Sequence, residues 1–339
     1  MITPIHVQPY ATPYRYGKPV LEGSGQPGAF DSRSVDVPFV FYHQGRYHMM
    51  YTGYDGTGYQ TALSASDDLL HWQFEHMMLS RETSSRWDAT NLCGTWLLKE
   101  SDTLRDTPRL KKWQGRYWMA YHAYPSIGYE EGPAEIGIAW CADEDLRHWT
   151  RLENPVLSWR DGEPWEHGGL YKACLLDIGG VFYMFYNAKT DGEPWIEQTG
   201  FCTSADLVHW QRSGLNPILP VSPGQWDSRF ASDPYIVRDG AQWLMFYYGY
   251  DGVHAQDGLA ISDDLLHWQK AEAPLLAHGQ PGNLDSIHAH KPAMVWHNGQ
   301  LYHFYCACRE HRAGDATEVW NEYRTITVAS NQAFTEEQA

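Results

Sequence analysis

The chain has 339 residues, with 25 Lys and Arg against 42 Asp and Glu, and its formal net charge is −17. Such an acidic chain is not expected to bind nucleic acid or an anionic membrane surface, because both partners require clustered cations. Apolar residues make up 43% of the sequence, which is enough for a large core, and no segment approaches the roughly 20 apolar residues of a membrane span.

The first 29 residues contain several prolines and show no strand or helix periodicity. We expect this segment to form an arm that lies across the domain, with part of it completing the last repeat described below. The segment has neither the basic stretch nor the apolar stretch of a signal peptide, so we expect a cytoplasmic protein. These prolines include Pro4, Pro9, Pro13 and Pro19.

From residue 30 onward the sequence is built from repeats. The motif D-L-x-H-W occurs four times, and its tryptophans lie about 60 to 80 residues apart. We expect the aspartate to cap a local turn and the tryptophan to pack between neighbouring repeats, so the motif is interpreted as scaffold. The four copies occupy residues 68–72, 145–149, 206–210 and 264–268.

Each repeat contains an aromatic segment that follows a tight turn. Aromatic enrichment between turn residues indicates β-strands joined as hairpins. These segments occupy residues 47–51, 117–121, 182–186, 243–247 and 301–305. Nine residues ahead of each segment another strand begins, usually with a proline, which is tolerated where no ladder hydrogen bond is required. That place is held by Pro38, Pro108, Ala173, Pro234 and Pro292.

Five such units, the last of which lacks the D-L-x-H-W motif, predict an all-β fold in the form of a five-bladed β-propeller. The whole chain is then a single domain, whose truncated last unit is completed by N-terminal residues. The predicted blades cover residues 30–80, 81–157, 158–220, 221–277 and 278–330, followed by a polar tail at 331–339.

The six cysteines form no C-x-x-C pair, and several lie within predicted strands. We therefore expect buried free thiols in a reducing compartment in place of disulfides or a zinc site. They are Cys93, Cys141, Cys174, Cys202, Cys306 and Cys308.

Candidate site residues follow from the repeat alignment. The first strands of propeller blades converge on a central funnel, so the residues just before the aligned proline should line it. Their types differ between repeats, and burying that many ionisable groups is costly unless they are paired or used. A purely structural role as strand-start caps remains the alternative for the aspartates. The candidates are Asp36, Asp106, Lys172, Asp233, His290 and Lys291.

A second aligned position carries an acid in all five units, which indicates an architectural role. The third unit has a glutamate there, Glu166, followed by His167 and two glycines, so scaffold and catalytic roles both stay open for it. Glu197, which opens the third strand of the same unit, is an alternative acid. The five aligned acids are Asp31, Asp88, Glu166, Asp227 and Asp285.

The sequence D-V-P-F-V-F-Y-H-Q-G-R-Y-H-M-M-Y at 36–51 and the strand at 259–268 resemble the five-bladed propeller glycosidases of families 43, 32, 117 and 130. The resemblance implies three acids from successive blades: a base or nucleophile, a substrate-orienting aspartate and a general acid. Carried over by position, these are Asp36, Asp106 and Glu166. Hydrolysis requires one charged and one protonated carboxylate at the same pH.

Two departures from the family pattern affect this assignment. Asp36 stands one residue before the family position, so a bulge is needed to turn it inward. Lys172 occupies the slot of the family glutamate. Together with Lys291 it indicates an anionic substrate, such as a uronic acid or a sulfated sugar, or a phosphate co-substrate.

Three functions remain open from the sequence. The first is a glycoside hydrolase that removes a terminal sugar from a small, plant or algal saccharide. The second is a phosphorylase of the family-130 type, with Lys172, Lys291, His290 and Arg309 around phosphate. The third is a catalytically silent sugar-binding propeller. Aromatic residues in loops would stack on sugar rings in each case, namely Tyr54, Tyr124, Trp195 and Tyr250.

No cofactor is expected. Some members of the resembled families hold a calcium or a histidine-bound ion near the ring axis, and the resemblance would place such an ion at His288 and His290. The expected partner is an oligosaccharide or glycoside.

Overall fold

The computed structural model describes residues 5–335, so the outer ends of the predicted arm and tail, at 1–4 and 336–339, lie outside the described residues. The described part of the chain is all-β, as predicted, with 20 strands and three single-turn 3₁₀ helices. No helix in residues 5–335 is both long and apolar enough to cross a membrane. The 3₁₀ helices are η1 (Gln8–Tyr10), η2 (Trp159–Asp161) and η3 (Pro164–Glu166).

The strands form five antiparallel groups in chain order. The first two groups are separate four-stranded sheets. Group one contains β2 (Ser34–His43), β3 (Arg46–Tyr54), β4 (Tyr59–Ser66) and β5 (Gln73–Leu79). Group two contains β6 (Asn91–Leu97), β7 (Tyr117–Tyr124), β8 (Glu135–Cys141) and β9 (Thr150–Arg151).

The other three groups are joined by single parallel residue pairs between β12 and β14 and between β16 and β18. Group three contains β10 (Leu170–Ile178), β11 (Val181–Lys189), β12 (Glu197–Ser204) and β13 (Gln211–Arg212). Group four contains β14 (Phe230–Asp239), β15 (Gln242–Tyr250), β16 (Ala255–Ser262) and β17 (Gln269–Lys270). Group five contains β18 (His288–His297), β19 (Gln300–Glu310), β20 (Glu322–Ser330) and the N-terminal β1 (Tyr14–Arg15).

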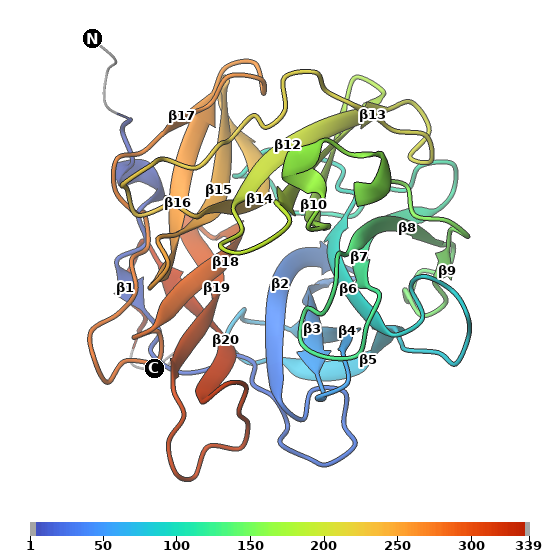
Figure 1. Cartoon of the computed structure of the whole chain (residues 1–339). Helices are drawn as coiled ribbons and strands as arrows, with labels where there is room; N and C mark the ends of the chain where they lie inside the picture. The colour runs from blue at the N-terminus through green and yellow to red at the C-terminus, as the bar shows by residue number, and fades with distance from the viewer. Residues whose placement is uncertain (1–4, 336–339) are drawn as a thin grey trace.

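The first strands of the five groups meet in the middle of the molecule. Each contacts the next, and β18 contacts β2, so these strands close a ring. Figure 1 shows the groups arranged around this centre, with β2, β10, β14 and β18 facing it. The ring also closes at its edge, because Tyr14 of β1 pairs with Ser330 of β20, far apart in the sequence. The aromatic segments of the repeats form the buried second strands.

Every first strand carries a β-bulge near its start. A bulge adds one residue to a strand and redirects its side chain. In four groups the added residue adopts the left-handed region, and the aligned Pro38, Ala173, Pro234 or Pro292 follows it. The four φ angles are 56° at Val37, 41° at Lys172, 54° at Asp233 and 66° at Lys291.

The D-L-x-H-W motif forms a capped turn, as predicted. In its first copy Asp68 accepts hydrogen bonds from the backbone N–H of Leu70 and of His71, and its other oxygen lies 2.7 Å from His71 Nδ1. These bonds lower the pKa of Asp68 to about 2. The ring of Trp72 packs edge-on against Phe304 of group five, so the tryptophan joins neighbouring groups.

Group two differs from the prediction. Its first strand is β6, whereas the segment around Pro108 is a loop that follows β6. Pro108 O accepts from the N–H of Tyr42, and Leu104 N–H donates to Arg238 O, both at 2.8 Å. Tyr42 lies six residues beyond Asp36 on β2, which is about 20 Å along a strand. The loop therefore covers the end of the ring opposite the bulges.

Candidate active site

A cavity of about 540 Å³ opens at the end of the ring where the bulges lie. The added residues Val37, Lys172, Asp233 and Lys291 all line it. Three loops between second and third strands add further lining residues, at 125–134 in group two, 190–196 in group three and 311–321 in group five. Polar and aromatic side chains share the lining, as they do in saccharide sites. Its aromatic lining residues are Tyr59, Tyr124, Tyr129, Tyr171, Trp195, Phe230, Tyr248, Tyr250 and Trp320.

Glu197 is the carboxylate with the environment of a general acid. It opens β12 and lines the cavity. Trp195 Nε1 donates to its Oε1 at 3.1 Å, and Ser232 Oγ donates to its Oε2 at 2.9 Å. Burial, with the negative charge of Asp233 nearby, raises the pKa of Glu197 to about 7 in spite of the Lys189 ammonium, which acts in the opposite direction. The group therefore carries a proton at pH values where ordinary carboxylates do not.

Asp233 lies beside Glu197 in the same cavity. It is 5% exposed, and burial raises its pKa to about 6, against the attraction of Lys172 and Lys291. Asn187 links the two acids, because its amide nitrogen donates to Asp233 Oδ1 at 3.1 Å in the orientation that satisfies both of its polar atoms. The amide oxygen then takes the position 3.4 Å from Glu197 Oε2.

Glu130 is another cavity carboxylate, and it differs from Asp233 in being partly exposed. It lies in the 125–134 loop and lines the cavity. Tyr59 OH donates to its Oε1 at 3.2 Å, and Lys291 Nζ lies 3.8 Å from the same atom. With 38% of its side chain exposed, the carboxylate is accessible to substrate. Glu130 therefore has both a hydroxyl donor and a neighbouring ammonium as polar partners.

Asp36, the expected base, does not face the cavity. The bulge turns the following residue, Val37, to the cavity, and Asp36 is completely buried. Its Oδ2 lies 2.7 Å from Lys291 Nζ and 3.6 Å from Arg324, and its Oδ1 lies 2.6 Å from Cys306 Sγ. Lys291 and Arg324 hold the pKa of Asp36 far below its usual range in spite of burial. The required bulge is present, but it is one residue too late to expose Asp36.

Asp106 and Glu166 also lie outside the cavity, which corrects the positions expected for them. Asp106 is exposed in the loop at the opposite end of the ring, where it accepts from Ser101 Oγ at 2.6 Å. Glu166 ends η3 and is fully buried. Its carboxylate accepts from Tyr186 OH at 2.6 Å and lies 3.0 Å from Arg212 Nε.

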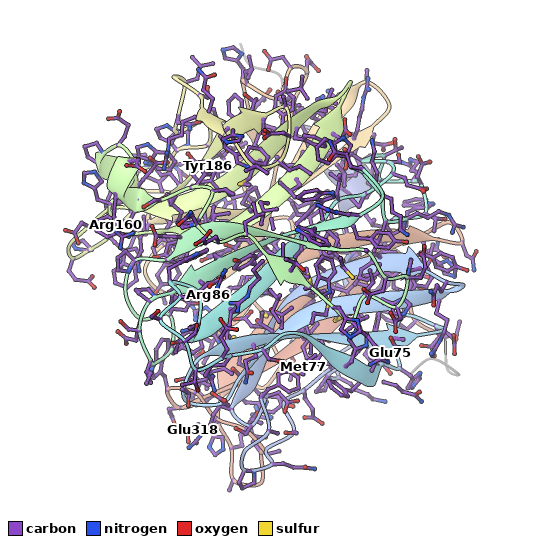
Figure 2. The ribbon with its side chains drawn as sticks, turned by 90° about the vertical axis from the view of Figure 1, so that its right-hand side faces the viewer. Glu75, Met77, Arg86, Arg160, Tyr186 and Glu318 are labelled. Carbon is purple, nitrogen blue, oxygen red and sulfur yellow. The ribbon has the colours of Figure 1, made fainter. Side chains whose placement is uncertain are left out.

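Glu166 repeats what three of its four aligned partners do. Asp88 accepts from Tyr121 OH at 2.6 Å, Asp227 from Tyr247 OH at 3.2 Å, and Asp285 from Tyr305 OH at 2.9 Å. Each also has a cationic partner. Figure 2 shows Tyr186 and Arg86, which belong to two of these clusters, on one flank of the molecule. The aligned acid therefore links the segment that precedes the first strand of its group to the second strand of the same group. Glu166 has this structural role.

The expected binding residues divide into two sets. Lys172, Asp233, Glu197, His290 and Lys291 all line the cavity. Burial, with the Lys291 ammonium beside it, holds the pKa of His290 well below its usual range, so its ring is neutral. Arg309 does not line the cavity, and its guanidinium group forms a bidentate pair with Asp315 at 2.7 Å. It is therefore not placed to bind substrate.

Sequence reasoning missed Glu130 and Trp320. Both lie in loops between second and third strands, whereas the repeat alignment covered only strand starts. The lengths of the connections could have indicated these loops. Groups two and five have more residues between their second and third strands than groups one and four. Of the predicted stacking residues, Tyr124, Trp195 and Tyr250 line the cavity and Tyr54 does not.

No cluster of three or more potential metal ligands occurs within residues 5–335. The rings of His288 and His290 lie 5.6 Å apart. Burial lowers the pKa of His288 to about 3, and its Nδ1 accepts from Ala255 N–H at 3.0 Å. The six cysteines are free and buried, as expected.

Comparison with known proteins agrees with this fold. Residues 173–338 match the glycosyl hydrolases family 32 N-terminal domain. A solved structure named "Glycoside hydrolase" is 28% identical with a TM-score of 0.81, and the match covers 96% of this chain and 93% of that protein. A second solved structure, described as an RGII complex, is 27% identical with a TM-score of 0.82, and the match covers 97% of this chain and 95% of that protein.

Among curated proteins, the 1,2-beta-oligomannan phosphorylase of Thermoanaerobacter sp. (strain X514) is 25% identical over 127 residues, which are 35% of this chain and 42% of that protein. The chain spans about half the length of the curated relatives it matches. These similarities confirm the resemblance to the propeller glycosidase superfamily, and the class of protein that emerges is a glycosidase-related enzyme.

Proposed function

We propose that the protein is a glycoside hydrolase in which Glu197 is the general acid and Glu130 is the ionised partner. The observation that carries this proposal is the contrast between two cavity carboxylates. Glu197 is held protonated near neutral pH by burial and by Asp233, whereas Glu130 is exposed beside Lys291. Glycoside hydrolysis requires one carboxyl group in each state.

In this mechanism the glycosidic bond lies between the two carboxyl groups. Glu197 donates its proton to the leaving oxygen as the bond from the anomeric carbon breaks. Glu130 either attacks the anomeric carbon or removes a proton from the attacking water, and the anomer first formed, observed by NMR, distinguishes these routes. Water supplies the new hydroxyl group in both.

The ring of first strands supports the five-bladed propeller as the architecture that carries this site. Five strand groups surround a common centre, and their first strands contact one another in a closed cycle. An oligosaccharide substrate is supported by the aromatic lining of the cavity and by the RGII complex of a relative.

A phosphorylase is the second candidate, because curated relatives include enzymes of that name. Of the cations predicted to surround phosphate, Lys291 is bound to Asp36, Arg309 is bound to Asp315, and His290 is neutral. The cavity therefore offers one uncommitted cation from that set, Lys172. A single uncommitted cation favours water over phosphate as the acceptor of the glycosyl group.

The test is product release from a panel of aryl glycosides and plant or algal oligosaccharides, with and without phosphate. We expect phosphate-independent hydrolysis that falls by about 10²- to 10⁴-fold in Glu197→Gln, the usual contribution of a general acid. Glu130→Gln should lose a similar factor, and the exposed Asp263→Asn serves as the control. Turnover that depends on phosphate would replace the hydrolase with the phosphorylase, and ligand binding without turnover would leave a binding protein.

A further inference from the structure

Lys172 has an unusual position for a lysine. It is the added residue in the bulge of β10, with a left-handed φ of 41°. A branched or long side chain in this region carries strain, which is typical of functional positions. The residue lines the cavity although only 3% of it is exposed, which places it at the buried end.

The Nζ of Lys172 has no hydrogen-bond acceptor among the described residues. The other buried cavity cations each have at least one acceptor, although Arg324 Nε has none among the described residues. Lys291 Nζ donates to Asp36 at 2.7 Å, and Arg324 donates to Glu322 at 3.0 Å. Nearer the mouth, Lys189 lies 5.2 Å above the ring of Trp195. A buried ammonium without an acceptor is costly, so a ligand that supplies one would be bound favourably.

The groups around Lys172 do not supply the missing hydrogen-bond acceptor for its Nζ. Asp233 and Asp257 attract it electrostatically, but neither forms an ion pair with it. Asp257 is already engaged with His303 Nε2 at 2.9 Å. His122 accepts the backbone N–H of Lys172 at 3.2 Å, and burial lowers its pKa to about 3, so its ring adds no positive charge.

Lys172 therefore supplies one uncompensated positive charge at this end of the cavity. A carboxylate carries one negative charge and accepts an ammonium donor directly. A phosphate dianion would require a second uncommitted cation beside Lys172, and Lys291, which also lines the cavity, is bound to Asp36.

We propose that the cavity binds a glycosyl residue bearing a carboxylate, a uronic acid, and that Lys172 Nζ donates to that carboxylate. This inference rests on the proposed hydrolase function and names its substrate class. The ammonium fixes the acidic sugar at the buried end of the cavity, with the glycosidic bond toward Glu197 and Glu130.

The experiment compares aryl uronides with their neutral counterparts, such as glucuronide with glucoside and galacturonide with galactoside. Calorimetry with free glucuronate and galacturonate measures binding by the intact protein. Wild type should prefer the acidic member of one pair. Lys172→Met should lower kcat/KM for that uronide, and weaken uronate binding, by about 10- to 100-fold, and the loss for the neutral counterpart should be much smaller, so that the preference for the acidic sugar disappears.

Lys112→Met is the matched control, since it removes the same charge from the surface, where Lys112 pairs with Glu144. It should leave both activities unchanged. Lys172→Met should melt no lower than wild type, because it removes a buried charge without a partner. Should it fail to fold, Lys172→Arg keeps the charge and must keep the preference for the acidic sugar.

The outcomes separate this inference from the proposed function. Hydrolysis of neutral glycosides without any preference for uronides, or an equal loss for both in Lys172→Met, would overturn the carboxylate subsite and leave the hydrolase in place. Uronate binding that depends on Lys172 but comes without turnover would support the subsite and refute the hydrolase. Inorganic phosphate binding that is lost in Lys172→Met, with uronates not bound, would also overturn the subsite as stated.

Discussion

At the scale of single residues, function depends on the protonation of Glu197. Burial and the charge of Asp233 raise its pKa from 4.5 to about 7. A general acid acts only while it is protonated, so kcat/KM should be level near pH 6 and fall about tenfold per pH unit above pH 7. The pH profile of wild type measures this directly. A profile that stays level to pH 9 would contradict the assignment.

The same shift predicts how stability depends on pH. The folded protein binds the Glu197 proton more tightly than the unfolded chain, so folding stability is lost as pH rises from about 4.5 to 7. Glu197→Gln removes this loss. Its free energy of unfolding should exceed that of wild type by about 3 kcal/mol at pH 8, from 1.36 kcal/mol per pKa unit, and the two should converge near pH 4. Urea unfolding at both pH values tests this.

At the scale of strands and turns, one bulge residue decides which side chains enter the cavity. The aligned residues Pro38, Ala173, Pro234 and Pro292 lie within β2, β10, β14 and β18, three or four residues after each strand begins, and the residue directly before each is the one that faces inward. A period-two reading of β2 cannot show that Val37 replaces Asp36 at the cavity, because a bulge interrupts the alternation.

Group two could not be assigned from spacing alone. The loop at 98–110 carries Pro108 nine residues before an aromatic strand, just as the true strand starts do. Its position depends on contacts with β2 and β14, from other groups. Tertiary pairing of this kind leaves no local pattern, so Asp106 looked equivalent to Asp233 although the two lie at opposite ends of the ring. Glu130 and Trp320 were missed because loops have no repeat register.

The aligned acids give a prediction at this scale. Glu166→Gln should lower stability by about 1–3 kcal/mol, because the half-buried Arg212 and the Tyr186 hydroxyl lose a charged acceptor. Its kcat should stay within about twofold of wild type, since the residue does not line the cavity. Thermal melting and turnover of one aryl glycoside measure both effects. A large loss of kcat at an unchanged Tm would return Glu166 to the active site.

Arg160 provides a comparison on the same flank. It lies within η2, toward the edge of the molecule (Figure 2), and pairs with Glu135 while remaining 59% exposed. The exposed Arg160 end of this pair is screened by solvent, although Glu135 is only 9% exposed, so the pair contributes less than one in which both partners are buried. Arg160→Ala should therefore change stability much less than Glu166→Gln.

At the scale of the whole molecule, Asp36 joins the first and last strand groups. Its partners Lys291, Cys306 and Arg324 come from β18, β19 and β20. The pairing of β1 with β20 closes the ring at its edge, and Asp36 closes it near the axis. The repeats alone could predict a ring. They could not predict that Asp36, whose pKa is strongly lowered near the axis, would have a structural role.

Asp36→Asn should therefore destabilise the fold by about 3–5 kcal/mol, the cost of breaking a buried ion pair. Lys291 and Arg324 would remain buried with no full negative charge between them. Chemical unfolding measures the loss, with the exposed Asp263→Asn as the matched control. An Asp36→Asn protein of normal stability that has lost all turnover would instead make Asp36 catalytic.

The role of Glu197 as proton donor to the leaving group is tested most directly by varying that group. Wild type and Glu197→Gln are assayed with one glycoside carrying either a dinitrophenyl or an alkyl leaving group. A dinitrophenolate leaves without a proton, so the variant should retain most of its activity on that substrate and lose about 10²- to 10⁴-fold on the alkyl glycoside. Equal losses on both substrates would contradict the assignment of Glu197 as the general acid.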